Sequence, residues 1–195
     1  MSNKIIVLVG RSASGKDSLA KYLSENYGYK FVVSHTSRPP RPDESQNNPY
    51  KFINYNQFET MITNDEMIEF RTYETLVNGI PDKWLYGVSK DSIDLDNNNY
   101  IVILDIVGLK AFNKIYGDKV ISFYVNVSDS KRTERALHRN GFDQTEWDRR
   151  LIDDEKVFAI DIVKSNVSFI VKNYVFKKCI EDIKYCIKEY ECEHG

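Results

Sequence analysis

Eight residues near the amino terminus have the types and spacing of a phosphate-binding loop. Gly10, four further residues, Gly15 and Lys16 stand between a buried apolar strand and a helix. Glycines let the backbone curl so that successive N–H groups point inward, and a helix N-terminus adds about half a positive charge. The loop is therefore predicted to bind ATP, with Lys16 reaching the β- and γ-phosphates. The predicted ATP-binding residues are Gly10, Ser12, Ala13, Ser14, Gly15, Lys16, Asp17 and Ser18.

Position 17 departs from the usual loop, in which a Ser or Thr hydroxyl binds magnesium. Here it is Asp17, followed by Ser18. A carboxylate is a good Mg²⁺ ligand but repels phosphate when the metal is absent, so we expect metal-dependent nucleotide binding. A role for Asp17 as a helix N-terminal charge alone is the alternative. Asp105, which ends a predicted strand beside the first, is a second candidate ligand, although such a residue is often a helix cap.

A second candidate anion site lies in a proline-stiffened loop. Arg38 and Arg41 are three residues apart, with Pro39, Pro40 and Pro42 around them. Guanidinium groups bind phosphate oxygens bidentately, and the prolines reduce the entropy lost when both are presented together. The pair is predicted to bind a monophosphate, and a solvated Arg-Pro loop is the alternative.

The sequence around these arginines resembles the guanylate kinase family. The segment Ser34–Glu44 is similar to the family's Ser-x-Thr-Thr-Arg-x-Pro-Arg-x-Gly-Glu. Other shared segments follow in family order: Tyr50 with Phe52, 64–70, Tyr86-Gly87 and 103–106. The resemblance implies transfer of the γ-phosphate of ATP to GMP or dGMP. It also implies that Ser34, Arg38, Arg41 and Tyr50 bind the acceptor monophosphate, that Glu69 accepts hydrogen bonds from guanine, and that Tyr86 closes the acceptor pocket.

The departures from the family concern the base. Val88 stands where the family has Ser or Thr, and Val107 where it has Asp. Loss of two hydrogen-bonding groups is expected to relax or redirect base selection. Glu69 still favours a purine with adjacent N–H donors, which is guanine, and Trp84 is available to stack on a base.

Basic residues after position 128 predict a lid. Arg132, Arg135 and Arg139 are spaced to share one helix face, and Arg149 and Arg150 follow beyond Gly141. A solvated helix is the alternative on charge alone, but the resemblance implies lid arginines at 135, 139 and 150. Because phosphoryl transfer needs alignment and charge neutralisation rather than a general base, the predicted catalytic residues are Lys16, Arg38, Arg135, Arg139 and Arg150.

Two other functions remain possible from the sequence. The same transfer could go to another nucleotide or to a phosphorylated sugar, as the two valines suggest. Guanylate-kinase-like domains can also serve as interaction modules without catalysis, although the intact Gly15-Lys16 pair argues against this here. Nucleic-acid binding is disfavoured by the net charge of −2.

Alternating apolar segments must position these residues. Buried strands followed by helices predict an α/β, three-layer P-loop fold with a central parallel sheet. Predicted strands are 4–9, 31–33, 67–70, 101–105, 120–127 and 168–171, and the tract 71–99 is predicted to be irregular. Ser128 and Thr145 are expected to begin helices that reach about 141 and 164. A final helix is predicted to place Cys179 and Cys186 on one packed face.

Length and composition predict a single domain of 195 residues. We expect a core of 1–33, 100–128 and 155–195, a monophosphate-binding insert at about 34–99 and a lid at about 129–154. No apolar run approaches the roughly 20 residues of a membrane helix. We therefore expect a cytoplasmic enzyme of nucleotide metabolism with no nucleic-acid or membrane partner, acting as a monomer or homodimer.

Overall fold

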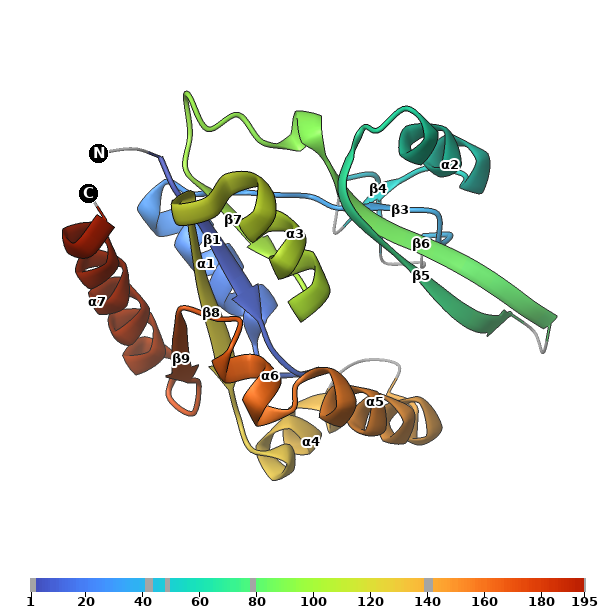
Figure 1. Ribbon diagram of the computed structural model, residues 1–195. Coiled ribbons are helices and arrows are strands. Elements are labelled where there is room, and N and C mark those ends of the chain that lie inside the picture. Colours follow the sequence, from blue (N-terminus) through green and yellow to red (C-terminus); the bar gives the residue numbers. More distant parts are fainter. Residues whose placement is uncertain (1–2, 41–43, 48–49, 78–79, 139–141, 195) are drawn as a thin grey trace. The chain divides into compact units, whose positions relative to one another are not determined.

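A computed structural model describes residues 3–40, 44–47, 50–77, 80–138 and 142–194. The chain divides into two compact units (Figure 1). The core unit comprises Met1–Phe31 and Asn98–Gly195, and the insert unit comprises Val32–Asn97. Each unit has its own sheet, and each is described by itself.

The core unit contains a five-stranded parallel sheet in the order β2-β7-β1-β8-β9. The strands are β1 (Ile5–Val9), β2 (Lys30–Phe31), β7 (Tyr100–Ile103), β8 (Val120–Asn126) and β9 (Phe169–Lys172). Every residue of β1 is fully buried, as its apolar sequence predicts for a central parallel strand. The predicted parallel sheet is confirmed, but β2 is shorter than expected and ends before Val32.

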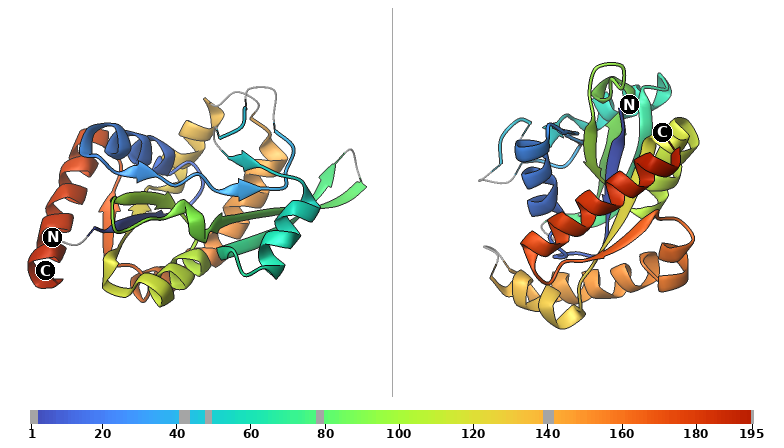
Figure 2. Two further views of the ribbon diagram at one scale, coloured as in Figure 1. Left: turned by 90° about the horizontal axis from the view of Figure 1, so that it is seen from above. Right: turned by 90° about the vertical axis from the view of Figure 1, so that its left-hand side faces the viewer.

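Helices cover both faces of this sheet. Leu19 and Leu23 of α1 (Lys16–Tyr27) share a core with Ile6 and Leu8 of β1 and with Ile183 of α7 (Phe176–His194). Helix α3 (Ile106–Tyr116), followed by the 3₁₀ turn Gly117–Lys119, lies on the opposite face from α1 (Figure 2). Cys179 packs in the α7 core, as predicted. Within the described residues, none of the helices has the length and apolarity needed to cross a membrane.

The helices after β8 differ from the prediction. They are α4 (Asp129–Leu137), α5 (Gln144–Val157) and α6 (Ile160–Lys164). Asp143, not Thr145, caps α5 by accepting a hydrogen bond from Glu146 N at 2.7 Å. Ser128 occupies the N-cap position of α4 but makes no side-chain cap bond. The expected long helix is interrupted after Val157, because Ala159 adopts an extended ψ of 139° that the helix cannot continue through.

The insert unit contains a four-stranded sheet in the order β4-β3-β6-β5. The strands are β3 (His35–Thr36), β4 (Lys51–Phe52), β5 (Met67–Val77) and β6 (Ile80–Ser89), and the 3₁₀ turn Lys90–Ser92 follows. Helix α2 (Tyr55–Thr63) begins at a reciprocal capping box between Asn54 and Gln57. Phe58, Met67 and Leu85 form the core of this unit.

The long β5–β6 hairpin overturns the prediction of an irregular tract at 71–99. The strands pair antiparallel from Met67 with Ser89 to Val77 with Ile80 (Figure 1). Asn78 and Gly79, which join them, lie outside the described residues. An Asn-Gly dipeptide between alternating apolar and polar residues is a hairpin signal in sequence, and the abundance of polar residues concealed it.

Candidate active site

The loop between β1 and α1 has the curl that its glycines predict. Gly10 has φ 154° and Gly15 has φ 93°. A Cβ added to Gly15 would lie 2.5 Å from Asn173 Nδ2, and one on Gly10 would lie 2.9 Å from the Val125 carbonyl oxygen. Both positions therefore combine a backbone conformation and a close approach that only glycine accommodates without strain.

Lys16 lies across its own loop. Its Nζ donates to the carbonyl oxygens of Gly10 at 2.7 Å and Arg11 at 3.1 Å. The amine is thus anchored where the strand ends, while its backbone begins α1. This position places a cation at the loop that is predicted to bind phosphate.

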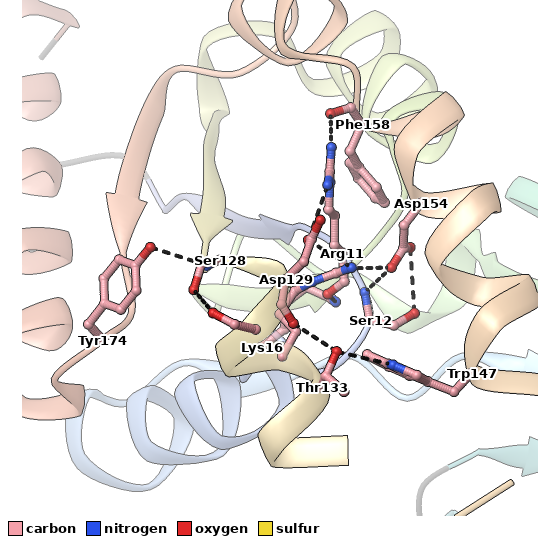
Figure 3. Close-up of polar contacts among 12 residues, drawn as sticks. Arg11, Ser12, Lys16, Ser128, Asp129, Thr133, Trp147, Asp154, Phe158 and Tyr174 are labelled. Carbon is pink, nitrogen blue, oxygen red and sulfur yellow. Dashed lines mark hydrogen bonds and ion pairs between the residues drawn. The ribbon is translucent and has the colours of Figure 1, made fainter. Parts of the chain in front are cut away.

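A carboxylate on α5 binds the same loop, a contact that sequence analysis missed. Asp154 Oδ2 accepts hydrogen bonds from Ser12 N and from Arg132 Nη1, each at 2.7 Å. Ser12 Oγ lies 3.5 Å from Asp154 Oδ1 (Figure 3). Asp154 therefore links α4 and α5 to the phosphate loop. No local motif predicts this link, because 142 positions separate Ser12 from Asp154.

Arg132 is a core residue, so its predicted place on an open lid face is wrong. The residue is 0% exposed, and its guanidinium carbon lies 5.7 Å from the Trp147 ring centroid. Its Nη2 is 3.3 Å from Asp129 Oδ1. Arg132 and Ala136, four residues apart, share the side of α4 that packs, and Ala136 forms a small core with Ala13 and Trp147.

Arg135 contacts the phosphate loop as a lid arginine could. Its Nη1 donates to the Ser14 carbonyl oxygen at 3.1 Å, and its Nη2 donates to the Asn173 carbonyl oxygen at 2.6 Å. Asn173 Nδ2 donates to the same Ser14 oxygen at 2.9 Å, which adds a residue that sequence analysis did not single out. Arg150 pairs with Glu146 at 2.7 Å. Arg139 lies outside the described residues.

The candidate metal ligands lie at two helix starts in the core unit. Asp17 and Ser18 are exposed in the first turn of α1. Asp105 caps α3, accepting a hydrogen bond from Gly108 N at 2.7 Å. Among the described residues there is no cluster of three or more His, Cys, Asp or Glu side chains suited to a metal. Mg²⁺ usually binds through one or two carboxylates plus substrate phosphates, so this donor set fits magnesium.

Arg38 is the centre of the candidate acceptor site in the insert unit. It is 4% exposed, and its Nη2 lies 2.9 and 2.8 Å from the two Glu44 carboxylate oxygens. Its Nε donates to the Tyr86 hydroxyl at 3.1 Å, and its Nη1 donates to the Pro39 carbonyl oxygen at 2.9 Å. Burial opposes its charge, but the hydrogen bond to Glu44 and the nearby Tyr86 raise the pKa of Arg38 overall.

Aromatic rings surround this guanidinium. Arg38 lies 5.7 Å from the Tyr50 ring centroid and 5.6 Å from that of Phe52. The Tyr50 and Tyr86 rings meet edge to face at 5.5 Å. Arg38 and Tyr50, predicted to bind the monophosphate, and Tyr86, predicted to close the acceptor pocket, are therefore close together. Ser34 lies one residue before β3, and Arg41 is outside the described residues.

The residues predicted to concern the base lie on the hairpin and on α3. Glu69 of β5 pairs in register with Val88 of β6, and Val88 is 0% exposed. Trp84 Nε1 donates to Asp82 Oδ2 at 3.1 Å. Val107 is 56% exposed in the first turn of α3, in the core unit. The base-selecting roles of these residues remain predictions.

Comparison with known proteins identifies the relatives of this chain. A family model described as guanylate kinase matches residues 2–190. The chain belongs to the guanylate kinase family. A guanylate kinase of Bacteroides thetaiotaomicron is 31% identical over 150 residues, which cover 75% of this chain and 70% of that protein. One of Porphyromonas gingivalis is 24% identical over 192 residues, or 96% and 97% of the two chains.

A solved structure has the same fold. The crystal structure of guanylate kinase from Anaplasma phagocytophilum matches with a TM-score of 0.64 at 19% identity, covering 96% of this chain and 86% of that one. The predicted family, α/β fold and enzyme class are thus confirmed, and the class is that of ATP-dependent nucleoside monophosphate kinases.

Proposed function

We propose that this protein transfers the γ-phosphate of ATP to GMP and dGMP. The observation that carries the proposal is the acceptor cluster of Arg38, Tyr50 and Tyr86, whose Tyr86 lies on the same hairpin as Glu69, in a guanylate kinase family member with a complete phosphate loop. The phosphate loop supports a triphosphate donor, and the cluster supports a monophosphate acceptor.

The donor phosphates bind the loop of residues 10–15 and Lys16. Inward backbone N–H groups supply donors, and the start of α1 supplies partial positive charge. Asp154 and Arg135 hold the loop in its curled form before nucleotide arrives, because they bind Ser12 and Ser14 directly. This preorganisation lowers the entropy lost on binding.

Magnesium is the metal that the proposal requires, with Asp17 as a ligand or as an acceptor for its water and Asp105 near it. Bound Mg²⁺ neutralises charge on the donor phosphates. The carboxylate of Asp17, rather than a hydroxyl, adds negative charge beside those phosphates. Triphosphate affinity is therefore expected to fall sharply when EDTA removes the metal, and an unchanged affinity would contradict the role of Asp17.

The acceptor monophosphate binds Ser34, Arg38, Arg41 and Tyr50, with Tyr86 closing the pocket. The ion pair with Glu44 holds the Arg38 guanidinium in one position before the acceptor binds. Glu69 accepts hydrogen bonds from the base. The alignment of acceptor oxygen and γ-phosphate, rather than a general base, then determines the rate.

Residues 129–154 act as the lid of this proposal. Arg135, Arg139 and Arg150 join Lys16 and Arg38 in neutralising the charge that spreads over the transferring phosphoryl group. Closing of the lid also excludes water, which would otherwise accept the phosphoryl group from ATP.

A coupled assay of ADP formation tests the proposal. We expect turnover with GMP and dGMP, slow turnover with other common ribo- and deoxyribonucleoside monophosphates, and loss of activity by at least about 10³-fold in Lys16→Met, because a charge stabilising the transition state is removed. Lys21→Met, an exposed lysine of α1 that pairs with Glu25, is the matched control.

Other results identify the alternatives. Rapid turnover of a different monophosphate or of a phosphorylated sugar, with none for guanine nucleotides, would replace the proposed acceptor. Absence of any phosphoryl transfer with retained ligand binding would favour an interaction module without catalysis.

A further inference from the structure

We propose that Arg71 is a specificity-determining residue that, together with Glu69, reads the hydrogen-bonding edge of guanine. This inference rests on the proposed function, because it concerns the base of the same acceptor. It assigns to a residue of β5 the hydrogen-bond donor role that Val88, in place of the family's Ser or Thr, cannot fill.

Arg71 lies on the face of the hairpin that carries the acceptor residues. On β5, Glu69, Arg71 and Tyr73 alternate with their neighbours and share one face. Arg71 pairs in register with Tyr86, whose hydroxyl accepts from Arg38 Nε. The Tyr73 and Tyr86 rings meet edge to face at 5.4 Å, which confirms that the side chains of this face lie together.

Arg71 and Glu69 form a partly desolvated ion pair. Arg71 Nη1 is 3.7 Å from Glu69 Oε2, and the Glu69 side chain is 8% exposed whereas that of Arg71 is 25% exposed. Arg71 Nη1 also donates to the Phe70 carbonyl oxygen at 2.5 Å, which fixes the guanidinium against β5. At 3.7 Å the pair is an ion contact rather than a close two-bond fork, and it places the guanidinium and the carboxylate side by side on β5.

The two side chains present a row that matches guanine. The guanine edge offers two N–H donors, at N2 and N1, followed by an acceptor at O6. A carboxylate offers two acceptors, and the adjacent guanidinium offers donors, as in the contacts of Arg with guanine O6 in nucleic-acid recognition. Adenine would direct its N1 lone pair at the Glu69 carboxylate, and xanthine would direct its O2 carbonyl there. Unpaired buried polar groups of that kind cost affinity.

Val88 strengthens the assignment. It pairs with Glu69 across the hairpin, is 0% exposed and carries no donor or acceptor. The neighbouring strand therefore supplies no donor for O6 at this register position. Arg71, two residues along the same strand from Glu69, supplies it instead. An Arg71 that only neutralised Glu69 would stabilise the carboxylate equally for every base with an N1–H group. An Arg71 that donates to O6 would instead favour bases that carry an acceptor at that position, and binding measurements can distinguish the two roles.

The test compares three acceptors that differ at single positions. GMP has both the N2 amino group and O6, IMP lacks the amino group, and 6-thio-GMP replaces O6 by sulfur, a weak hydrogen-bond acceptor. Calorimetric Kd and steady-state kcat and KM are measured for each acceptor with wild-type protein, Arg71→Met and Arg71→Gln. Lys90→Met, which removes a surface cation paired with Asp65 in the same unit, is the control.

We expect Arg71→Met to raise the Kd and KM for GMP by roughly 10- to 100-fold, the range for a hydrogen bond to a charged group, with little change in kcat or in the KM for ATP. Its preference for GMP over 6-thio-GMP should nearly vanish, whereas its preference for GMP over IMP, set by Glu69, should persist. Arg71→Gln, which retains an N–H donor, should recover part of the lost preference.

An Arg71→Met variant that kept the wild-type ratio of GMP to 6-thio-GMP affinity would overturn the inference while leaving the proposed function intact. Equal loss of the GMP preference over both analogues would also overturn it, because it would indicate general collapse of the pocket. Wild-type protein that neither bound nor phosphorylated GMP would instead refute the proposed function.

Discussion

Two buried arginines, one in each unit, have nearly the same immediate surroundings, although we propose a substrate-binding role for only one of them, Arg38. Arg132 in the core unit is 2.7 Å from Asp154, and Arg38 in the insert unit is 2.8 Å from Glu44. Each also lies 5.6 to 5.7 Å from an aromatic ring. Burial, a carboxylate partner and an aromatic neighbour therefore do not distinguish a structural arginine from one that binds substrate.

The difference lies in what the carboxylate partner contacts next. Asp154 accepts hydrogen bonds both from Arg132 Nη1 and from the Ser12 backbone N–H, so the core pair is bonded directly to the phosphate loop. Glu44 accepts from Arg38 Nη2, while Arg38 Nε donates to the hydroxyl of Tyr86, and the Tyr50 ring centroid lies 5.7 Å from the guanidinium carbon. The carboxylate of the Arg132 pair therefore binds the backbone of the phosphate loop, whereas the Arg38 pair lies among tyrosine side chains that we propose to form the acceptor site.

The largest expected effect is on stability in the core unit. Arg132→Ala leaves the Asp154 carboxylate, 12% exposed, without its buried partner, and should lower the free energy of unfolding by about 3–5 kcal/mol. Urea unfolding followed by circular dichroism measures the change. Arg149→Ala, which removes exposed ion pairs to Glu146 and Asp153, serves as the control and should change the free energy of unfolding by less than about 1 kcal/mol. A cost for Arg132→Ala as small as that of the control would erase the contrast between the two arginines.

Arg38→Ala should act mainly on the acceptor. Loss of charged hydrogen bonds worth about 1.5–3 kcal/mol each should reduce kcat/KM for GMP by roughly 100-fold or more while the KM for ATP changes little. The coupled assay with each substrate varied in turn separates the two effects. An equal rise in both KM values would mean that Arg38, like Arg132, supports the fold rather than the ligand.

Replacing both charges of the core pair sharpens the comparison. Arg132→Leu combined with Asp154→Leu removes the buried charges together, and its free energy of unfolding should return to within about 1–2 kcal/mol of wild type. The KM for ATP should rise nonetheless, because Ser12 N–H loses its acceptor and the loop its anchor. Wild-type ATP kinetics in the double variant would contradict a role of Asp154 in shaping the loop.

The smallest effect is expected at an exposed pair. Hydrogen bonds from Arg149 and Arg150, opposed by partial burial, lower the pKa of Glu146 from 4.5 to about 2. Because the pKa is lower in the folded state, this contribution is present above pH 4.5 and is lost as pH falls toward 2. Solvent screening limits it to less than about 1 kcal/mol. Glu146→Gln should reduce the decrease in unfolding free energy between pH 4.5 and pH 2, measured by acid unfolding. An unchanged decrease would mean that other carboxylates cause it.

Local patterns in the sequence predicted the curl of the phosphate loop and the central parallel sheet. Gly10, Gly15 and Lys16 act within one turn, so their spacing contains the geometry. Arg38 and Tyr86 were predicted through the family resemblance, and their contact at 3.1 Å brings them together.

What the sequence could not predict depends on distant contacts. Arg132 and Arg135 are one helical turn apart, so their spacing alone does not show which of them is buried. Arg132 packs against Trp147, whereas Arg135 donates to the Ser14 carbonyl oxygen. Asp154 was not singled out because its partner Ser12 is far away in the chain. The hairpin was missed for another reason, since its alternating residues were interpreted by their polarity rather than by their period of two.

The connection of the insert unit to the core sheet has a consequence for how the protein can be rebuilt. The chain leaves the sheet after Phe31 and re-enters at Tyr100, and Lys30 is directly paired with Tyr100, while Lys30 N donates to Asn99 O at 2.9 Å. The outgoing and the returning backbone therefore lie side by side, as two neighbouring parallel strands. A segment with adjoining ends can be exchanged for another without shifting the register on either side. Because we propose that the insert unit binds the acceptor, grafting a different segment between β2 and β7 is expected to direct the donor chemistry to another acceptor.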